Sequence, residues 1–205
     1  SAVAFAAALE AERCDIYTDV DGIYTSDPKI VSKAKKLNYV SFEEMIEMSS
    51  QGAKVLETRS VALAMRYGVR LQVLSSFQNL RGTFVVGEEE IMEKNIVSGI
   101  VHSLNVAKIT IVGIPDKPGQ AAKLFSGLAN SSINVDMIVQ SSSVDSNATD
   151  LTFTVPQNEL DYAIEAIKKT QIDVGFEKIL SDVDVGKIAV VGVGMHTRPG
   201  VAQKM

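Results

Sequence analysis

Strand-like and helix-like hydrophobic patterns alternate along the chain from residue 108 onward. The first, Ile109–Ile114, has the length and the β-branched residues of a buried strand. After a polar turn the apolar positions take helical spacing, return twice to strand-like runs, and then take helical spacing again. The predicted strands are 109–114, 133–140, 149–155 and 176–180, and the predicted helices are 121–129 and 159–169. This order predicts an α+β fold in which helices cover one face of an antiparallel sheet.

The opening of this unit recurs near the carboxyl end of the chain. Lys187–Val193 mirrors Lys108–Ile114, and Pro199–Met205 mirrors Pro118–Leu124 after a longer turn. An internal repeat supports an architecture more strongly than any single motif does. We therefore expect a second copy of the unit, which stops inside its first helix.

The first thirty residues follow an α/β pattern instead. Residues 1–10 are alanine-rich and predict a helix, and residues 14–18 predict a short strand. A loop rich in turn-forming residues, 19–29, comes directly after that strand. Ligands of α/β domains bind at the carboxyl ends of strands, so this loop is a candidate binding site. Its aspartates lack the alternating spacing and the closing Glu of a calcium loop, which favours turn-forming aspartates near a nucleotide.

Two helices and a strand are predicted after the loop. Ser41 begins the first helix with a capping box that is closed three residues later. The second helix is expected over 53–67, ended by Gly68 in the left-handed conformation, with a strand at 69–74 behind it. Lys54 would then lie in the first turn of the second helix, where a cation is unfavourable unless it binds a phosphate. On the residues alone, a solvated lysine is the favoured interpretation.

Residues 77–94 are predicted to connect two domains. They contain Asn79, Gly82 and Gly87, and they include the acidic run Glu88–Glu90, which is most simply a solvated linker. A domain boundary is therefore expected within this stretch.

Composition narrows the functional classes. The chain is 46% hydrophobic and 22% charged, which is typical of a soluble globular protein. Its net charge of −5 and pI near 5.1 argue against binding to nucleic acid, which normally needs a basic face. No apolar stretch approaches the roughly 18 residues of a membrane span. The single Cys14 cannot form an internal disulfide, which fits a reducing cytoplasm, and it is expected to be buried and structural.

Two sets of motifs make the chain similar to a known family. Tyr17–Lys29, with the sequence YTDVDGIYTSDPK, and Met48–Leu56, followed by Arg59 and Ser60, resemble the carboxyl half of the catalytic domain of aspartate kinases. The repeat from Lys108 onward resembles the ACT modules of that family, which are ferredoxin-like βαββαβ units that bind amino-acid effectors. The resemblance covers essentially the whole chain. It implies an α/β amino-acid kinase remnant at 1–80, a linker and connecting strand at 81–103, a first ACT module at 104–182 and the start of a truncated second module at 183–205.

The resemblance implies a role in ATP binding for six residues. Thr18 and Asp19 would lie against the nucleotide, Tyr24 near its base or ribose, and Lys29 near its phosphates. Lys29 stands where the family more often has Arg, so it offers charge without a bidentate guanidinium. The remaining two residues, Lys54 and Val55, fall in the family's second nucleotide-binding segment. The family's Lys-Phe-Gly-Gly phosphate-binding segment and its aspartate-binding residues have no match in this chain, so catalytic residues are expected outside it.

The turn from Asp116 to Gln120 has the chemistry of an amino-acid receptor. Gly119 and Gln120 begin a predicted helix, whose free backbone amides can hold a carboxylate. Asp116 can pair with an α-ammonium group. On the residues alone, a tight strand-to-helix turn capped by Asp116 is the favoured interpretation.

The resemblance to ACT modules shifts the interpretation of this turn toward effector binding. It adds residues at positions where the family contacts threonine or lysine, namely Ala121, Asn134, Val135, Asp136 and Gln140. In the second module the corresponding turn, Met195–Arg198, has no acidic residue. The two turns are therefore not expected to bind one ligand identically.

For the parent protein the resemblance implies phosphorylation of the L-aspartate side-chain carboxylate by ATP with Mg²⁺, the first step toward lysine, threonine and methionine. Lysine, threonine or both would inhibit through the ACT modules. These modules would pair in a homodimer, with a short subunit in some assemblies. Residues 1–205 alone are expected to be mainly regulatory and inactive, because phosphoryl transfer depends on positioning groups of which half are missing.

Two alternatives remain open. One is a non-catalytic regulatory subunit of such a kinase, and the other is a stand-alone ACT amino-acid sensor. The matches at residues 18–29 and 51–56 argue against the sensor.

Overall fold

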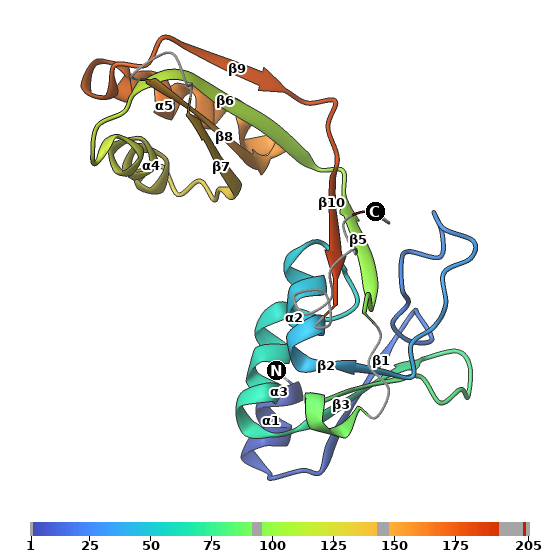
Figure 1. Ribbon diagram of the computed structural model, residues 1–205. Helices are drawn as coiled ribbons and strands as arrows, with labels where there is room; N and C mark the ends of the chain where they lie inside the picture. Colours follow the sequence, from blue (N-terminus) through green and yellow to red (C-terminus); the bar gives the residue numbers. More distant parts are fainter. Residues whose placement is uncertain (1, 92–95, 143–147, 193–202, 204–205) are drawn as a thin grey trace. The chain divides into compact units, whose positions relative to one another are not determined.

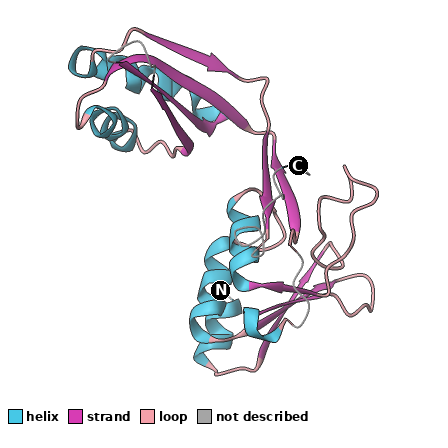
Figure 2. Ribbon diagram, viewed as in Figure 1, coloured by secondary structure: helices cyan, strands magenta, loops and turns pink. Residues whose placement is uncertain are grey.

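The computed structural model describes residues 2–91, 96–142, 148–192 and 203, and its helices and strands are drawn in Figures 1 and 2. The chain divides into two compact units. The first unit comprises residues 1–102 together with 188–205, and the second comprises residues 103–187. Each unit contains a buried apolar core of its own.

A four-stranded mixed sheet organises the first unit. In the order β1-β3-β4-β2, the outer pairs are parallel and the central pair, β3 with β4, is antiparallel. Three helices share one core with this sheet, in which Met45, Val61, Leu71 and Val85 are fully buried. The elements are α1 (Ala2–Ala8), β1 (Arg13–Thr18), β2 (Tyr39–Ser41), α2 (Phe42–Ser50), α3 (Thr58–Tyr67), β3 (Arg70–Ser75) and β4 (Thr83–Val86).

Local capping signals in the first unit are confirmed. The backbone N–H of Glu44 donates to Ser41 Oγ, and the backbone N–H of Ser41 donates to Glu44 Oε2, both over 3.2 Å. This reciprocal pair is the capping box that begins α2. Gly68 ends α3 with φ 65° and ψ 24°, in the left-handed conformation that the sequence predicts.

The start of the second helix was predicted wrongly. Helix α3 begins at Thr58 and not at residue 53, because Glu57 takes an extended N-cap conformation with φ −76° and ψ 131°. Residues 53–57 follow a non-helical path that carries Leu56 into the core, where it is 9% exposed. Lys54 therefore lies in the α2–α3 connection rather than in the first turn of a helix.

The prediction of a plain connector at residues 77–94 is also wrong. Within it, β4 lies between β3 and β2, and Val85 has no exposed surface. The acidic run forms a 3₁₀ turn, η1 (Glu88–Glu90), in which Glu90 is paired with Arg70 of β3. A four-residue strand that is buried on both faces shows no alternation of polar and apolar residues. The flanking glycines therefore made this stretch resemble a loop.

A two-stranded sheet joins distant parts of the chain. It consists of β5 (Gly99–Ser103) and β10 (Lys187–Val191), and residues 188–191 of β10 belong to the first unit. The backbone N–H of Ser98 donates to the carbonyl of Val191 over 2.8 Å. The strand predicted to open a second repeat is thus present as β10, whereas the turn and most of the helix predicted after it lie outside the described residues.

The second unit has the predicted α+β architecture. Its sheet has the order β7-β8-β6-β9, and all its neighbouring strands are antiparallel. Buried side chains of β6 and β8, including Ile109, Ile111 and Phe153, pack with those of α4 and α5, including Leu128 and Ile167. The elements are β6 (Val106–Pro115), α4 (Gln120–Asn130), β7 (Asp136–Ser142), β8 (Ala148–Pro156), η2 (Gln157–Glu159), α5 (Leu160–Val174) and β9 (Lys178–Asp182).

Two predicted boundaries in this unit shift for local reasons. Strand β7 begins at Asp136, three residues later than expected, because Ile133 turns into the core as part of the α4–β7 connection. Helix α5 continues to Val174, whose side chain is buried, and ends at Gly175 with φ 77°.

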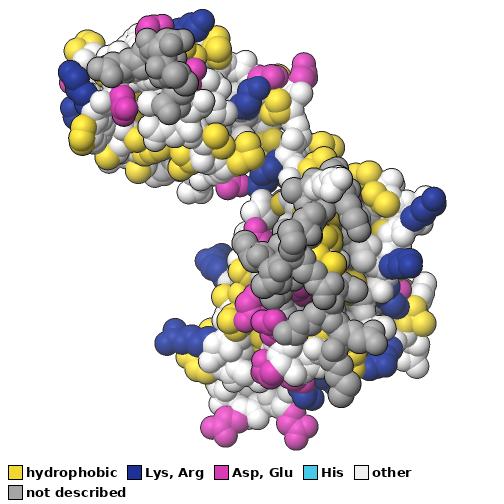
Figure 3. Space-filling model, viewed as in Figure 1, with side chains coloured by type: hydrophobic (Ala, Val, Ile, Leu, Met, Phe, Trp, Pro, Cys, Tyr) yellow, Lys and Arg dark blue, Asp and Glu magenta, His cyan; other side chains and the backbone are white. Residues whose placement is uncertain are grey.

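Burial and surface properties agree with several expectations from composition. Cys14 is buried, and burial raises the pKa of its thiol, which makes a reactive thiolate unfavourable. Across the described ranges, no helix is long and apolar enough to span a membrane. On the face drawn in Figure 3, Lys and Arg side chains lie scattered among acidic and apolar ones rather than in one patch.

Candidate functional site

The loop that follows β1 begins with two of the residues predicted to bind nucleotide. Thr18 is the last residue of β1, and its hydroxyl donates to Asp19 Oδ1 over 3.1 Å. Its carbonyl accepts from the backbone N–H of Ser76, just after the parallel strand β3. The carboxyl ends of two adjacent strands therefore fix the start of the loop, the position where α/β domains bind ligands.

Further along the loop, a carboxylate takes two hydrogen bonds. The Tyr24 hydroxyl donates to Asp21 Oδ1 over 2.9 Å, and Lys36 Nζ donates to Asp21 Oδ2 over 3.1 Å. Burial raises the pKa of the Asp21 carboxyl, but the bonds from Lys36 and Tyr24 outweigh it and lower the pKa below its ordinary value. The same bond to Asp21 raises the pKa of the Tyr24 phenol. Asp21 is thus held as a carboxylate at neutral pH.

A buried threonine fastens the loop to the sheet. The Thr83 hydroxyl, fully buried on β4, accepts from the backbone N–H of Ile23 over 2.9 Å and donates to the carbonyl of Leu37 over 2.6 Å. The carbonyl of Thr25 accepts from the backbone N–H of Ile100 on β5 over 2.7 Å. The loop is therefore tied to β4 at Ile23 and to β5 at Thr25.

The other predicted nucleotide-binding residues lie at two further places. Lys29 is exposed, and its backbone N–H donates to Asp27 Oδ1 over 2.8 Å, which shapes the tip of the loop. Lys54 is exposed in the α2–α3 connection, and the adjacent Val55 packs partly against the core of the first unit. The structure thus places Thr18, Asp19, Tyr24 and Lys29 on the loop after β1, which is hydrogen-bonded to β4 and β5. Lys54 and Val55 lie on another segment.

A pocket in the second unit contains most of the residues predicted to bind an effector. It lies at the β6–α4 turn and has a volume of about 300 Å³. Asp116, Gly119, Gln120, Ala121 and Gln140 all line it, with Ile114, Pro115, Lys117, Pro118, Thr149 and Leu151. Sequence reasoning missed Thr149 and Leu151. Because they alternate on one face of β8, and Thr149 is paired with Ile114, the strand pairing rather than any motif identifies them.

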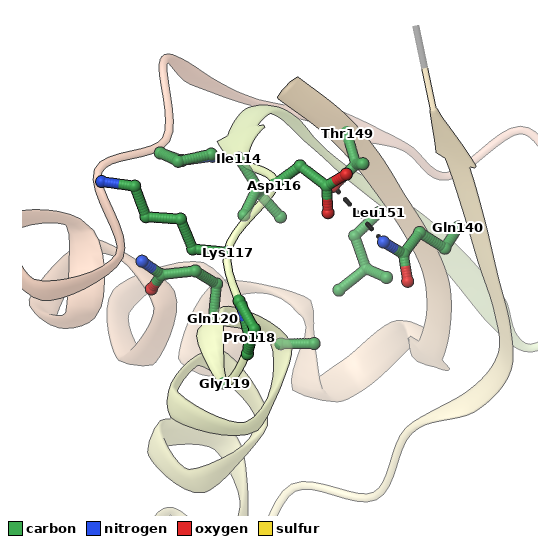
Figure 4. Close-up of a pocket in the computed structure, with 11 residues that line it drawn as sticks. Ile114, Asp116, Lys117, Pro118, Gly119, Gln120, Gln140, Thr149 and Leu151 are labelled. Carbon is green, nitrogen blue, oxygen red and sulfur yellow. Dashed lines mark hydrogen bonds between the residues drawn. The ribbon is translucent and has the colours of Figure 1, made fainter. Parts of the chain in front are cut away.

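The polar groups of this pocket come from three segments. Helix α4 begins at Gln120 after Gly119, whose φ is 90°, so the first amides of the helix lie at the pocket. Figure 4 shows the Asp116 side chain on the same side of the turn as Gln140 and Thr149, whereas the side chains of Lys117 and Gln120 extend the other way. Gln140 Nε2 lies 3.5 Å from Thr149 Oγ1, at the outer limit of a hydrogen bond. Amide donors and a carboxylate thus face one small cavity.

The remaining predicted effector residues do not line this pocket. Asn134 is exposed and Val135 packs partly against the core, both in the α4–β7 connection. Asp136 begins β7, and Lys187 Nζ donates to its Oδ2. This bond from Lys187, together with one from the Met137 amide, lowers the pKa of Asp136 despite partial burial. Asp136 therefore already has a cationic partner within the second unit.

Comparisons with known proteins match both units. The amino acid kinase family matches residues 1–75, and the ACT domain matches residues 109–171. An aspartate kinase of Pseudomonas fluorescens is 48% identical over 204 residues, which are 99% of this chain and 49% of that protein. The chain thus spans about half the length of the curated relatives it matches.

Solved structures agree with these matches. E. coli aspartokinase III, in complex with aspartate and ADP, superimposes with a TM-score of 0.80 at 27% identity, over 99% of this chain and 45% of that one. The same enzyme in complex with lysine and aspartate gives a TM-score of 0.75 at 27% identity, over 93% and 42%.

Fold, sites and matches define a chain that joins part of an amino acid kinase domain to an ACT regulatory domain. More particularly, the chain is similar along its whole length to aspartokinases, at 47–48% identity.

Proposed function

We propose that the complete protein containing this chain is an aspartate kinase, which transfers the γ-phosphoryl group of ATP, bound with Mg²⁺, to the side-chain carboxylate of L-aspartate. The observation that carries this proposal is the 48% identity to an aspartate kinase along the whole chain. The similarity to E. coli aspartokinase III, whose structure holds aspartate and ADP, supports the same substrates.

The first unit contributes nucleotide-binding groups to this reaction. Thr18, Asp19, Tyr24 and Lys29 would hold the nucleotide along the loop after β1, and Lys54 with Val55 would approach it from the α2–α3 connection. Phosphoryl transfer is mainly positioning and charge neutralisation, and the lysines provide cations for the phosphates. The aspartate-binding and catalytic groups would lie outside this chain, so residues 1–205 alone are proposed to have no turnover.

The second unit contributes regulation. Lysine, threonine or both would bind at the pocket of the β6–α4 turn, with the effector carboxylate on the α4 amides and its ammonium group on Asp116. We retain Asn134 and Val135 of the α4–β7 connection, with Asp136 at the start of β7, as effector-binding candidates outside this pocket. The proposed organisation is a kinase part at 1–80, a linker and connecting strand at 81–103, a first ACT module at 104–182 and the start of a second at 183–205.

The assembly and location are proposed on the same basis. ACT modules would pair across a two-fold axis in a homodimer, with a larger assembly including a short subunit in some members. A biosynthetic enzyme of this type acts in the cytoplasm, which fits one buried cysteine without a disulfide partner.

The test is a steady-state assay of the complete protein with ATP, Mg²⁺ and L-aspartate, alongside a purified 1–205 chain. We expect ADP release that depends on aspartate from the complete protein and none from the 1–205 chain. Calorimetric titration of the complete protein with lysine and with threonine, separately and together, then identifies the effector. Absence of aspartate-dependent turnover in the complete protein would refute the proposal, and turnover by the 1–205 chain would refute the division of labour.

A further inference from the structure

The hydroxyl group of Tyr24 already donates a hydrogen bond within the loop. A phenol has one O–H donor, and that of Tyr24 is given to Asp21 Oδ1 over 2.9 Å. A nucleotide could receive a hydrogen bond from this hydroxyl only after the bond to a carboxylate breaks. Hydrogen bonds to charged groups are about twice as strong as neutral ones, so the exchange is unfavourable. The ring of Tyr24 is therefore the part of the side chain available to a ligand.

Lys36 fixes the carboxylate that holds Tyr24. Its Nζ donates to Asp21 Oδ2 over 3.1 Å, so each oxygen of Asp21 has one partner. Lys36 and Tyr24 also face each other across an antiparallel backbone bridge. Three side chains from two segments thus form one closed cluster, in which Asp21 and Lys36 neutralise each other.

Packing limits any movement of this cluster. A Cβ atom added at Gly22 would lie 2.6 Å from Thr83 Oγ1 and 2.9 Å from Lys36 Cδ. The stem of Lys36 is therefore pressed against the loop backbone, which in turn is bonded to the buried Thr83. The side chains of Asp21 and Lys36 are only 23% and 28% exposed.

We infer that Asp21 and Lys36 are positioning residues for the nucleotide site, and that they orient Tyr24 so that its ring, not its hydroxyl, contacts the nucleotide. The inference rests on the proposed function of the loop. The neutral Asp21–Lys36 pair adds no net charge beside the polyphosphate, and its role is to fix one rotamer of the aromatic side chain. Aromatic faces stack on any base, so this contact would contribute affinity rather than base selectivity.

The test is a double-mutant cycle in the complete protein, with ADP affinity measured by calorimetry. Asp21→Leu removes the acceptor, and Tyr24→Phe removes the hydroxyl but keeps the ring. Each change is expected to weaken ADP binding by about tenfold, and the double variant no further, because both break the same hydrogen bond. Asp21→Asn keeps an acceptor for the phenol and is expected to recover most of the affinity. Lys36→Met, which keeps the stem, should give an intermediate loss.

Kinetics and a matched control separate positioning from general destabilisation. The KM for ATP should rise by about the same factor in Asp21→Leu, while kcat and the KM for aspartate stay within about twofold. Asp15→Ala removes another aspartate that is paired with a cation, Arg13, and should leave ADP binding unchanged.

The outcomes also distinguish this inference from the proposed function. If Tyr24→Phe weakens ADP binding while Asp21→Leu leaves it unchanged or strengthens it, the hydroxyl itself contacts the nucleotide and the inference is wrong. If both variants melt earlier but bind ADP normally, the cluster is purely structural and the inference is wrong. If the unaltered complete protein does not bind ADP, the proposed function fails and the inference fails with it.

Discussion

The loop after β1 and the turn before α4 are built in opposite ways. In the loop of the first unit, Lys36, β4 and β5 make hydrogen bonds to Asp21, Ile23 and Thr25. The turn of the second unit is shaped by its backbone, with the N–H of Lys117 donating to the carbonyl of Pro115 over 2.8 Å. A Cβ added at Gly22 would strike two side chains, whereas one added at Gly119 would meet no atom within 4 Å.

The difference indicates how each site would respond to change. A loop that is fixed before the ligand arrives needs less ordering on binding, which favours affinity and exact placement of phosphates. A turn with open space around it can bind and release an effector without disturbing the core. Changes in the loop should therefore affect folding and binding together, whereas changes in the turn should affect binding with little effect on folding.

The largest effect is expected from Thr83→Val. The hydroxyl of this fully buried residue serves both Ile23 and Leu37, so its loss leaves two backbone groups without their partner. At about 1–3 kcal/mol for each of the two buried groups, we expect a loss of roughly 2–6 kcal/mol in the unfolding free energy of the first unit. Urea denaturation followed by circular dichroism, with hydrogen exchange at the Ile23 amide, measures it.

Thr110→Val is the matched control for that change. Among the residues that the structure describes, the Thr110 hydroxyl bonds to the Thr152 hydroxyl alone, over 2.9 Å, and both are partly exposed. Its removal should alter the unfolding free energy by less than about 1 kcal/mol. Equal effects of the two changes would show that the loop is no more tightly fixed than the rest of the molecule.

The next effect concerns the two glycines. Gly22→Ala places a methyl group against Thr83 Oγ1 and Lys36. Overpacking of this kind lowers the free energy of unfolding by about 1–3 kcal/mol. We expect the same change to weaken ADP binding. Gly119→Ala meets open space, so only the left-handed backbone, with φ 90°, opposes it, at roughly 1–2 kcal/mol. Thermal unfolding and ADP calorimetry test the pair. If Gly119→Ala also impaired ADP binding, the two sites would not be separable in the way proposed.

Sequence reasoning recovered what is encoded locally. The capping box at Ser41, the end of α3 at Gly68 and the succession of strands and helices along the second unit all follow from short-range patterns. It also singled out Asp116 and Gln140, which the structure brings to one pocket. These features needed only spacing and turn chemistry, together with the family resemblance.

The contacts that could not be predicted from the sequence depend on how distant strands and segments pair. Thr83 reads as one residue of a short apolar run, and only the position of β4 beside the loop shows that its hydroxyl holds Ile23 and Leu37. Thr149 lines the pocket at the β6–α4 turn because of its register with Ile114. Asp136 was assigned to the effector, but its pairing with Lys187 joins residues far apart in sequence. Such contacts between distant segments leave no signature in a single sequence.

A regulatory effect is expected from Asp116→Ala in the complete enzyme. Removing the carboxylate deprives the effector ammonium group of its partner, so the half-inhibitory concentration should rise by about 5- to 150-fold, the usual range of allosteric coupling. The uninhibited rate should be nearly unchanged, because the change lies in the open turn. Inhibition curves with lysine and threonine measure it, with Asp161→Asn on the exposed start of α5 as the control. An unchanged curve would remove Asp116 from the site.

The smallest expected effect is on the pH dependence of stability, which should differ between the Asp136–Lys187 and Asp21–Lys36 ion pairs. Hydrogen bonds from Lys187 and the Met137 amide lower the folded-state pKa of Asp136, so its contribution to stability is present above the unfolded value of about 3.8 and is lost as the pH falls through the folded value. The Asp136 side chain is 58% exposed, so this contribution should stay below about 1 kcal/mol. Asp136→Asn should therefore lower the melting temperature slightly at pH 7, and this effect should fade as the pH falls from about 3.8 through the folded-state pKa of Asp136.

The same titration of Asp21→Asn completes the comparison. The pKa of Asp21 is lowered in the same direction, but its carboxylate is 23% exposed and is held by both Lys36 and Tyr24. Asp21→Asn should lower the melting temperature at pH 7 by more than Asp136→Asn does. This effect should also disappear as the pH falls through the folded-state pKa of Asp21. A difference that did not shrink as the pH was lowered below about 3.8 would mean that the Asp21 cluster acts through packing rather than charge, and the loop would then be fixed mainly by Thr83.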